Sequence, residues 1–138
     1  MKSGEYYSNQ RVGIFIDVQN LYHSAKNLYH GRVNYRELIK YLVGGRQLIR
    51  SMAYVVKSET AAGEAQFFEA LTKSGLELRV KDLQIYPGGM KKADWDVGLA
   101  VDAIRMSSFL DVIILVTGDG DYLPLVDYLK WGVGRLVE

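Results

Sequence analysis

The residues most able to do chemistry in this chain are aspartates at the ends of apolar segments. Five of them are Asp17, Asp94, Asp96, Asp119 and Asp121. Asp17 directly follows the apolar run Val12–Ile16, and Asp119 and Asp121 come just after a second apolar run, Val112–Val116. Carboxylates ~4 Å apart repel by about 4 kcal/mol at an effective dielectric near 20, so a shared cleft must bind a cation or take up protons.

The donor set decides which cation fits. The chain has no cysteine and two histidines, so zinc sites built from those residues are excluded. Carboxylate oxygens are hard ligands that suit Mg²⁺ or Mn²⁺, ions that keep several waters and bind phosphates readily. This combination favours hydrolysis of a phosphodiester by a metal-activated water.

Each aspartate also has an ordinary structural interpretation. Asp94 and Asp121 could be helix N-caps, and Asp96 could complement a helix dipole. Asp119 could be an Asx-turn residue. The metal site therefore depends on convergence, which requires the right arrangement of strands and helices.

Four other polar residues are candidates for a role beside these aspartates. Asn20 follows Asp17 by three residues and is either an N-cap or an amide that orients a phosphate or a metal-bound water. Lys91 and Lys92 lie in a glycine-flanked loop and are either a solvated pair or contacts for a nucleic-acid backbone. Asp102 lies six residues after Asp96, about 240° around a helix, so we expect it to be supporting rather than catalytic.

The elements that must position these residues alternate along the chain. Strands are expected over Val12–Ile16, Leu48–Val56, Leu76–Tyr86, Val112–Val116 and Val133–Glu138. Helices are expected over Leu21–Leu28, 35–43, Ala61–Lys73, Asp94–Met106 and Tyr122–Trp131. This order predicts a three-layer α/β sandwich (αβα) with a mostly parallel central sheet, of the Rossmann-like type. Ligands of such sheets bind outside the carboxyl ends of the strands where strand order reverses, so neighbouring first and fourth strands would bring the aspartates together.

Three local features of these elements can be checked directly. Asn34 is expected to cap the second helix, with Glu37 in the capping-box position. The strand Leu76–Tyr86 is expected to be kinked or bulged near Lys81. In the helix that begins at Asp94, the apolar stripe is expected to be buried. That stripe consists of Val97, Ala100, Val101 and Ile104.

Length and composition are those of one globular domain. The chain has 138 residues, of which 49% are hydrophobic and 24% are charged, with a net charge of +1. We expect a flexible tail over residues 1–10 and a single domain over 11–138 that is truncated at its last strand. No apolar run approaches the ~20 residues of a membrane span, which makes the cytoplasm the expected compartment.

Three segments together carry a resemblance to a known family. They are Phe15–Tyr22 (FIDVQNLY), Lys92–Ala103 (KADWDVGLAVDA) and Leu115–Val126 (LVTGDGDYLPLV). In type, order and spacing the chain resembles the NYN domains, a branch of the PIN-like nuclease superfamily, and most closely the LabA-like group. The resemblance implies a PIN-like αβα sandwich with a divalent-metal ribonuclease-type site.

The resemblance also implies roles for individual residues. Asp17, with Asn20, corresponds to the first-strand motif and Asp17 would be a metal ligand. Asp96 would be the helix-borne acid, and Asp119 the acid after the fourth strand, with Asp121 beside it. The chain departs from the family pattern at three positions, of which none removes a carboxylate: Val18, Gln19 and Thr117, the last in place of a common serine.

The expected function is a metal-dependent endoribonuclease that hydrolyses RNA phosphodiester bonds. Asp17, Asp96, Asp119 and Asp121 would bind Mg²⁺ or Mn²⁺, and Asn20 would orient the scissile phosphate. Lys91 and Lys92 would contact the RNA, expected to be single-stranded. Asp94, Asp102 and Thr117 would support the site. A homodimer and a C-terminal domain beyond this sequence are further expectations about its partners.

Two other functions remain open at this point. The first is a catalytically weak or inactive PIN-like module that binds RNA or protein. The second is a phosphoacceptor of the receiver type, which needs an acidic pair after the first strand and an acceptor aspartate after the third. Asp17 is followed by Val18, and the third strand ends at Tyr86 and Pro87, so this function is disfavoured.

Overall fold

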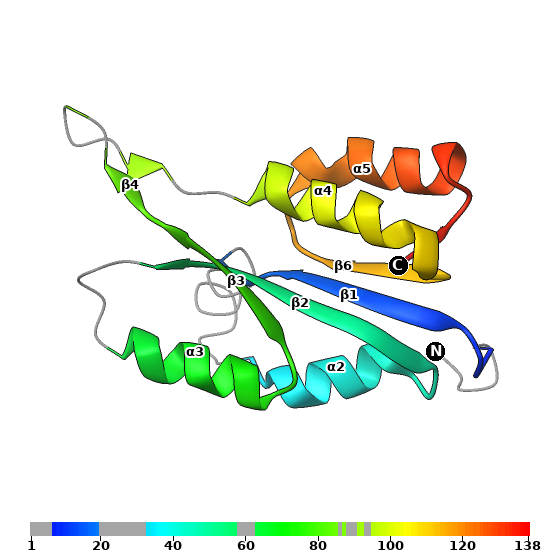
Figure 1. Ribbon diagram of the computed structural model, residues 1–138, viewed down its shortest axis with the longest axis horizontal. Coiled ribbons are helices and arrows are strands. Elements are labelled where there is room, and N and C mark those ends of the chain that lie inside the picture. Colours follow the sequence, from blue (N-terminus) through cyan, green and yellow to red (C-terminus); the bar gives the residue numbers. More distant parts are fainter. Residues whose placement is uncertain (1–6, 20–32, 58–62, 86, 88–90, 93–94) are drawn as a thin grey trace.

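The computed structural model describes residues 7–19, 33–57, 63–85, 87, 91–92 and 95–138. A parallel five-stranded sheet of order β3-β2-β1-β6-β7 lies between two layers of helices (Figure 1). Its strands are β1 (Arg11–Asp17), β2 (Gln47–Lys57), β3 (Glu77–Asp82), β6 (Val112–Val116) and β7 (Leu136–Val137). The helices are α2 (Tyr35–Val43), α3 (Glu64–Lys73), α4 (Asp96–Met106) and α5 (Leu123–Asp127). The predicted three-layer α/β architecture is confirmed.

The central strand β1 lies between β2 and β6. Its residues Val12 to Asp17 are all buried, as expected for a strand covered on both faces. The register pairs Ile16 with Val116, so β1 and β6 end side by side. Gly13 leaves room for the fully buried Leu110 side chain, which a Cβ at this position would displace. β1 and β6 are thus neighbours, which is the arrangement that convergence of the aspartates requires, and the strand order reverses between them.

The two faces of the sheet have separate cores. One core includes Ile14 and Ile16 on the side of α2 and α3, and the other includes Phe15 on the side of α4 and α5 (Figure 1). Because side chains alternate along a strand, Asp17 shares the face of Phe15. Asp17 therefore points to the layer that contains α4 and α5.

The start and end of α2 follow the local signals in the sequence. The Asn34 side chain accepts a hydrogen bond from the Glu37 backbone N–H at 3.2 Å, and Gly44 adopts φ 57° at the C-cap. The predicted cap at Asn34 is confirmed. In contrast, α4 begins at Asp96 with Trp95 in the N-cap position, so the expected cap at Asp94 is wrong; Asp94 itself lies outside the described residues.

The face of α4 that packs on the sheet differs from the predicted one. Leu99 and Ala103 are fully buried, whereas Val97 and Val101 are 75% and 45% exposed. The helix carries apolar residues around most of its circumference, so periodicity alone could not identify the buried side. The expected stripe instead faces a groove beside α5.

The predicted third strand is also corrected. Strand β3 ends at Asp82, and the chain then forms β4 (Gln84–Ile85), which pairs antiparallel with β5 (Lys91–Lys92) in a second, small sheet. At the place where a kink near Lys81 was expected, the chain instead leaves the main sheet and enters the small one. Lys91 and Lys92, which were expected to lie in a loop, form strand β5. Figure 1 shows β4 continuing from β3 away from the main sheet.

The segment after β6 is less regular than the single helix expected over Tyr122–Trp131. It begins with a 3₁₀ turn over Gly120–Tyr122, continues as α5 and ends in a π-type turn over Tyr128–Gly132. The helix expected over Leu21–Leu28 lies outside the described residues. Among the residues described, none of the helices combines the length and apolarity that a bilayer crossing requires.

Candidate metal centre

The turn after β6 is shaped by its own polar side chains. The Thr117 hydroxyl oxygen accepts a hydrogen bond from the Asp119 N–H at 3.1 Å. The Asp119 carboxylate in turn accepts one from the Asp121 N–H at 2.9 Å and caps the 3₁₀ turn. These bonds hold both aspartates at the carboxyl end of the sheet, beside the end of β1.

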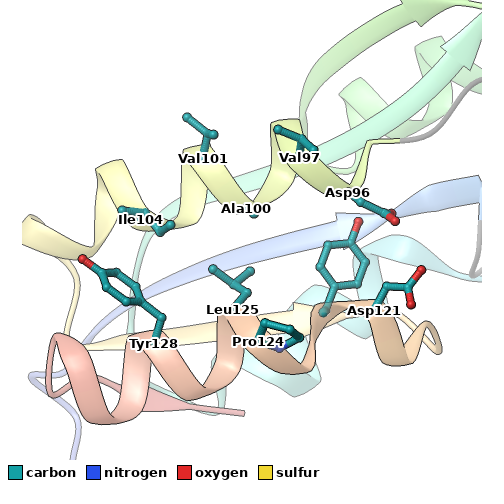
Figure 2. Close-up of a pocket in the computed structure, with 10 residues that line it drawn as sticks. Asp96, Val97, Ala100, Val101, Ile104, Asp121, Pro124, Leu125 and Tyr128 are labelled. Carbon is teal, nitrogen blue, oxygen red and sulfur yellow. The ribbon is translucent and has the colours of Figure 1, made fainter.

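Three of the predicted aspartates meet at this place. Asp96, at the start of α4, and Asp119 and Asp121 each offer a carboxylate oxygen, and the three oxygens lie within 4.8 Å of one another. Asp96 and Asp119 are half-buried and Asp121 is exposed. Figure 2 shows Asp96 and Asp121 at the same end of a groove between α4 and the segment that contains α5.

Asp17 is connected to this group by a hydrogen bond from the Tyr122 hydroxyl. Asp17 is almost fully buried, and its Oδ2 lies 3.4 Å from the Tyr122 hydroxyl that donates to it. Burial and the charges of Asp17 and Asp96 raise the pKa of Tyr122 well above its usual value, and hydrogen bonds to both carboxylates add to the effect. One hydroxyl thus contacts acids from β1 and α4, next to the turn that bears Asp119 and Asp121.

The donor set of the cluster fits a small divalent cation. Two oxygens bound to one Mg²⁺ at 2.0–2.1 Å lie at most about 4.2 Å apart, so separations within 4.8 Å need only a small closure. Without a counterion, two unit charges at 4.8 Å repel by about 3.5 kcal/mol at an effective dielectric near 20. Three carboxylates and no nitrogen or sulfur donor form a hard oxygen site of the kind that Mg²⁺ and Mn²⁺ prefer.

The other predicted residues have varied outcomes. Asn20 and Asp94 lie outside the described residues. Lys91 and Lys92 form β5, and their side chains are likewise outside what the structure describes. Asp102 is buried at 3% exposure on the face of α4 that packs on the sheet, apart from Asp96. This separation agrees with the 100° per residue of an α-helix.

Asp102 takes part in a polar network that anchors α4. Its Oδ2 accepts hydrogen bonds from the Tyr54 hydroxyl at 2.9 Å and from Arg79 at 2.7 Å. The Tyr54 ring also contacts Trp95 edge-on, with ring centroids 5.4 Å apart. Trp95 precedes Asp96 and donates from its indole N–H to the Val55 carbonyl at 2.8 Å. Trp95 therefore holds the start of α4 on the sheet, and with it Asp96 of the cluster.

Sequence reasoning missed Tyr122 and Trp95. Both lie within the quoted motifs, at the positions after Asp121 and before Asp96, but as aromatic residues they could not be distinguished from ordinary core residues. Both are indeed core residues, 4% and 8% exposed. The signal that could have found them is their position directly beside a candidate ligand.

A groove of about 390 Å³ runs away from the cluster between α4 and α5 (Figure 2). Asp96 and Asp121 line one end, and the rest of the wall is mostly apolar. The lining includes Val97, Val101, Ile104, Leu125 and Tyr128. Of these, Val97, Val101 and Ile104 are the α4 positions that the sequence pattern assigned to the core, and the other two come from the segment that contains α5.

Solved structures share this fold. A Vibrio parahaemolyticus protein of unknown function is 28% identical, with a TM-score of 0.85 over 96% of this chain and 81% of that one. A variant of the T5 5′-exonuclease is 15% identical, with a TM-score of 0.51 over 85% of this chain and 46% of that one, a likeness of fold alone. The search of curated protein sequences gave no match.

The match to a family model covers the whole described domain. The NYN domain model aligns with residues 11–138, from the first residue of β1 to the last residue of the chain. The fold is a PIN-like α/β fold, and the acidic cluster lies at the end of the sheet where strand order reverses. The chain belongs to the NYN domain family.

Proposed function

We propose that this NYN domain is a divalent-metal-dependent endoribonuclease of the LabA-like group, acting on single-stranded RNA in the cytoplasm. The observation that carries the proposal is the meeting of Asp96, Asp119 and Asp121 within 4.8 Å, from two segments far apart in the sequence. Membership of a family related to PIN-like nucleases, and the likeness in fold to an exonuclease, support the nuclease class. Asp17, a buried acid of β1, accepts a hydrogen bond from the Tyr122 hydroxyl beside this cluster.

In this proposal, Asp96, Asp119 and Asp121 hold Mg²⁺ or Mn²⁺. The ion, when bound, supplies a Lewis acid for the phosphate and a water of lowered pKa. Asp17, which accepts a hydrogen bond from Tyr122 at the end of β1, would contribute a further carboxylate ligand from the neighbouring strand. The hydrogen bonds that the Asp119 N–H donates to the Thr117 hydroxyl oxygen and the Asp121 N–H donates to the Asp119 carboxylate preorganise the turn, which lowers the cost of bringing the carboxylates together.

Other residues would bind the substrate. Asn20, three residues after Asp17, would orient the scissile phosphate. Lys91 and Lys92 would contact the RNA backbone from β5, because phosphate contacts position a nucleic acid without reading its sequence. The anionic cluster cannot attract a polyanion by itself, so both cations, the metal and the lysine pair, are needed in this account.

The direct test is cleavage of a circular single-stranded RNA, which has no ends and so reports endonuclease activity alone. We expect Mn²⁺-dependent opening of the circle, stopped by EDTA. Asp119→Asn should lower the rate by about 100-fold or more, because ligands of one metal act as a unit. Asp127→Asn is the matched control: it removes an exposed carboxylate from α5, outside the cluster, and should leave the rate unchanged.

Two outcomes would overturn the proposal. Activity that survives in Asp119→Asn, purified in parallel, would identify a contaminating ribonuclease. RNA binding without any cleavage in Mn²⁺ or Mg²⁺ would instead support the inactive binding module.

A further inference from the structure

Tyr122 occupies a place that ordinary core packing does not require. Its ring is 4% exposed and packs in the core between the sheet and α4 and α5, in one cluster with Trp95 and Leu99. Its hydroxyl, however, reaches the edge of that core, where it donates to Asp17 Oδ2 at 3.4 Å and lies close to the Asp96 carboxylate. A phenylalanine would fill the same core without these contacts.

The hydroxyl has one proton for two carboxylates. A phenol donates a single hydrogen bond, so Asp17 and Asp96 cannot both receive it at one time when both are ionised. A cation held by Asp96 would satisfy that carboxylate and leave the Tyr122 hydroxyl to Asp17. The hydroxyl is therefore placed to couple the acid of β1 to the cluster of Asp96, Asp119 and Asp121.

The backbone strengthens this coupling. Tyr122 ends the 3₁₀ turn that Asp119 caps, so the same short segment supplies two cluster carboxylates and the hydroxyl. A shift of the turn would move all three groups together. The buried ring holds the hydroxyl in a fixed position relative to the turn. Through its hydrogen bond, the hydroxyl then fixes Asp17 on the neighbouring strand relative to that turn.

We infer that Tyr122 is a positioning residue of the metal site, which fixes the Asp17 carboxylate relative to the three-aspartate cluster through its hydroxyl. This inference rests on the proposed function. Tyr122 contacts the acids and acts through Asp17. The ring packs in the hydrophobic core, and the hydroxyl orients a carboxylate at the metal site.

The test is Mn²⁺ binding measured by calorimetry on wild type and Tyr122→Phe, with the melting temperature of the metal-free proteins as a second readout. We expect the Kd for Mn²⁺ to rise about tenfold, as is typical when a residue that orients a metal site is lost. The control is Tyr128→Phe, which removes an exposed hydroxyl from the wall of the same groove and should leave the Kd within twofold of wild type. In the Asp17→Ala background, Tyr122→Phe should change the Kd by less than twofold.

The outcomes separate this inference from the proposed function. If wild type binds Mn²⁺ and Tyr122→Phe binds it equally well, the hydroxyl serves only the fold and the inference is wrong, while the proposed function stands. Additive effects of Tyr122→Phe and Asp17→Ala would also overturn it. If wild type binds no Mn²⁺, both fall. Should Tyr122→Phe unfold, Asp17→Ala alone decides, because an unchanged Mn²⁺ affinity in that variant contradicts the inference.

Discussion

Three buried tyrosine hydroxyls make the stability of the fold depend on pH. They belong to Tyr35, Tyr54 and Tyr122. Burial raises the pKa of each above the usual value near 10, and for Tyr35 it raises the pKa to about 12. Hydrogen bonds to Asp102, and to Asp17 and Asp96, contribute further at Tyr54 and Tyr122. Each hydroxyl is thus held neutral by its surroundings, and each resists ionisation as the pH rises.

This resistance predicts a loss of stability in alkali. Unfolded tyrosine ionises near pH 10, but folded Tyr35 keeps its proton up to about pH 12, so the stability is fully present below pH 10 and is lost as the pH rises towards 12. Between pH 9 and 11, Tyr35→Phe should lose about 1.4 kcal/mol less of its unfolding free energy than wild type. Urea unfolding at each pH measures this difference.

The matched control is Tyr41→Phe on the same helix, where the side chain is 73% exposed. It should lose as much stability as wild type over the same pH range. A Tyr35→Phe protein with the wild-type pH dependence would show that this hydroxyl ionises as easily in the folded protein as in the unfolded one.

At the residue scale, candidate metal ligands are easier to identify from the sequence than the residues that position them. Aspartates after apolar runs are visible because a carboxylate in that place is unusual. The hydroxyl of Tyr122 is not visible, because its contacts with Asp17 and Asp96 exist only once β1, α4 and the turn have met. The same applies to Trp95, whose indole bond to Val55 depends on how α4 packs on β2.

At the element scale, the position of α4 matters most, because it presents Asp96. Its anchor in the middle of the helix is Asp102, which accepts hydrogen bonds from Tyr54 on β2 and Arg79 on β3. Asp102→Ala would leave the buried Tyr54 hydroxyl without this acceptor. We expect the free energy of unfolding to fall by about 2–3 kcal/mol, as measured by urea denaturation.

Arg105→Ala provides the comparison. Arg105 pairs with the same carboxylate, but at 3.8 Å and with a side chain that is 73% exposed. Its loss should cost less than about 0.5 kcal/mol, because exposed ion pairs are worth little. Equal losses in the two variants would contradict the assignment of Asp102 as the anchor.

The sequence errors at this scale have one physical cause. Periodicity identifies a helix, but α4 is apolar on its sheet-facing side, at Leu99 and Ala103, and also on its groove side, at Val97 and Val101. Which side is buried then depends on tertiary contacts. In the same way, the alternating pattern from Leu76 onwards continues through β3 and β4 although the two strands belong to different sheets.

At the scale of the whole molecule, the order of strands and helices was the most predictable property. Alternation of apolar runs with helical segments requires crossover connections, and these produce a parallel sheet covered on both faces. The meeting of β1 and β6 then follows from the reversal of strand order, and it brings the carboxyl end of β1, with Asp17, beside the turn that bears Asp119 and Asp121. The sequence could predict the place of the site, but not which acids come within ligand distance of one another.

The most direct test of the account is an anomalous difference map from crystals of the wild-type protein soaked in Mn²⁺. We expect a peak bounded by the carboxylates of Asp96, Asp119 and Asp121, and its loss in crystals of Asp119→Asn soaked in the same way. A wild-type map at saturating Mn²⁺ with no peak between these three residues would contradict the claim that they form one metal site.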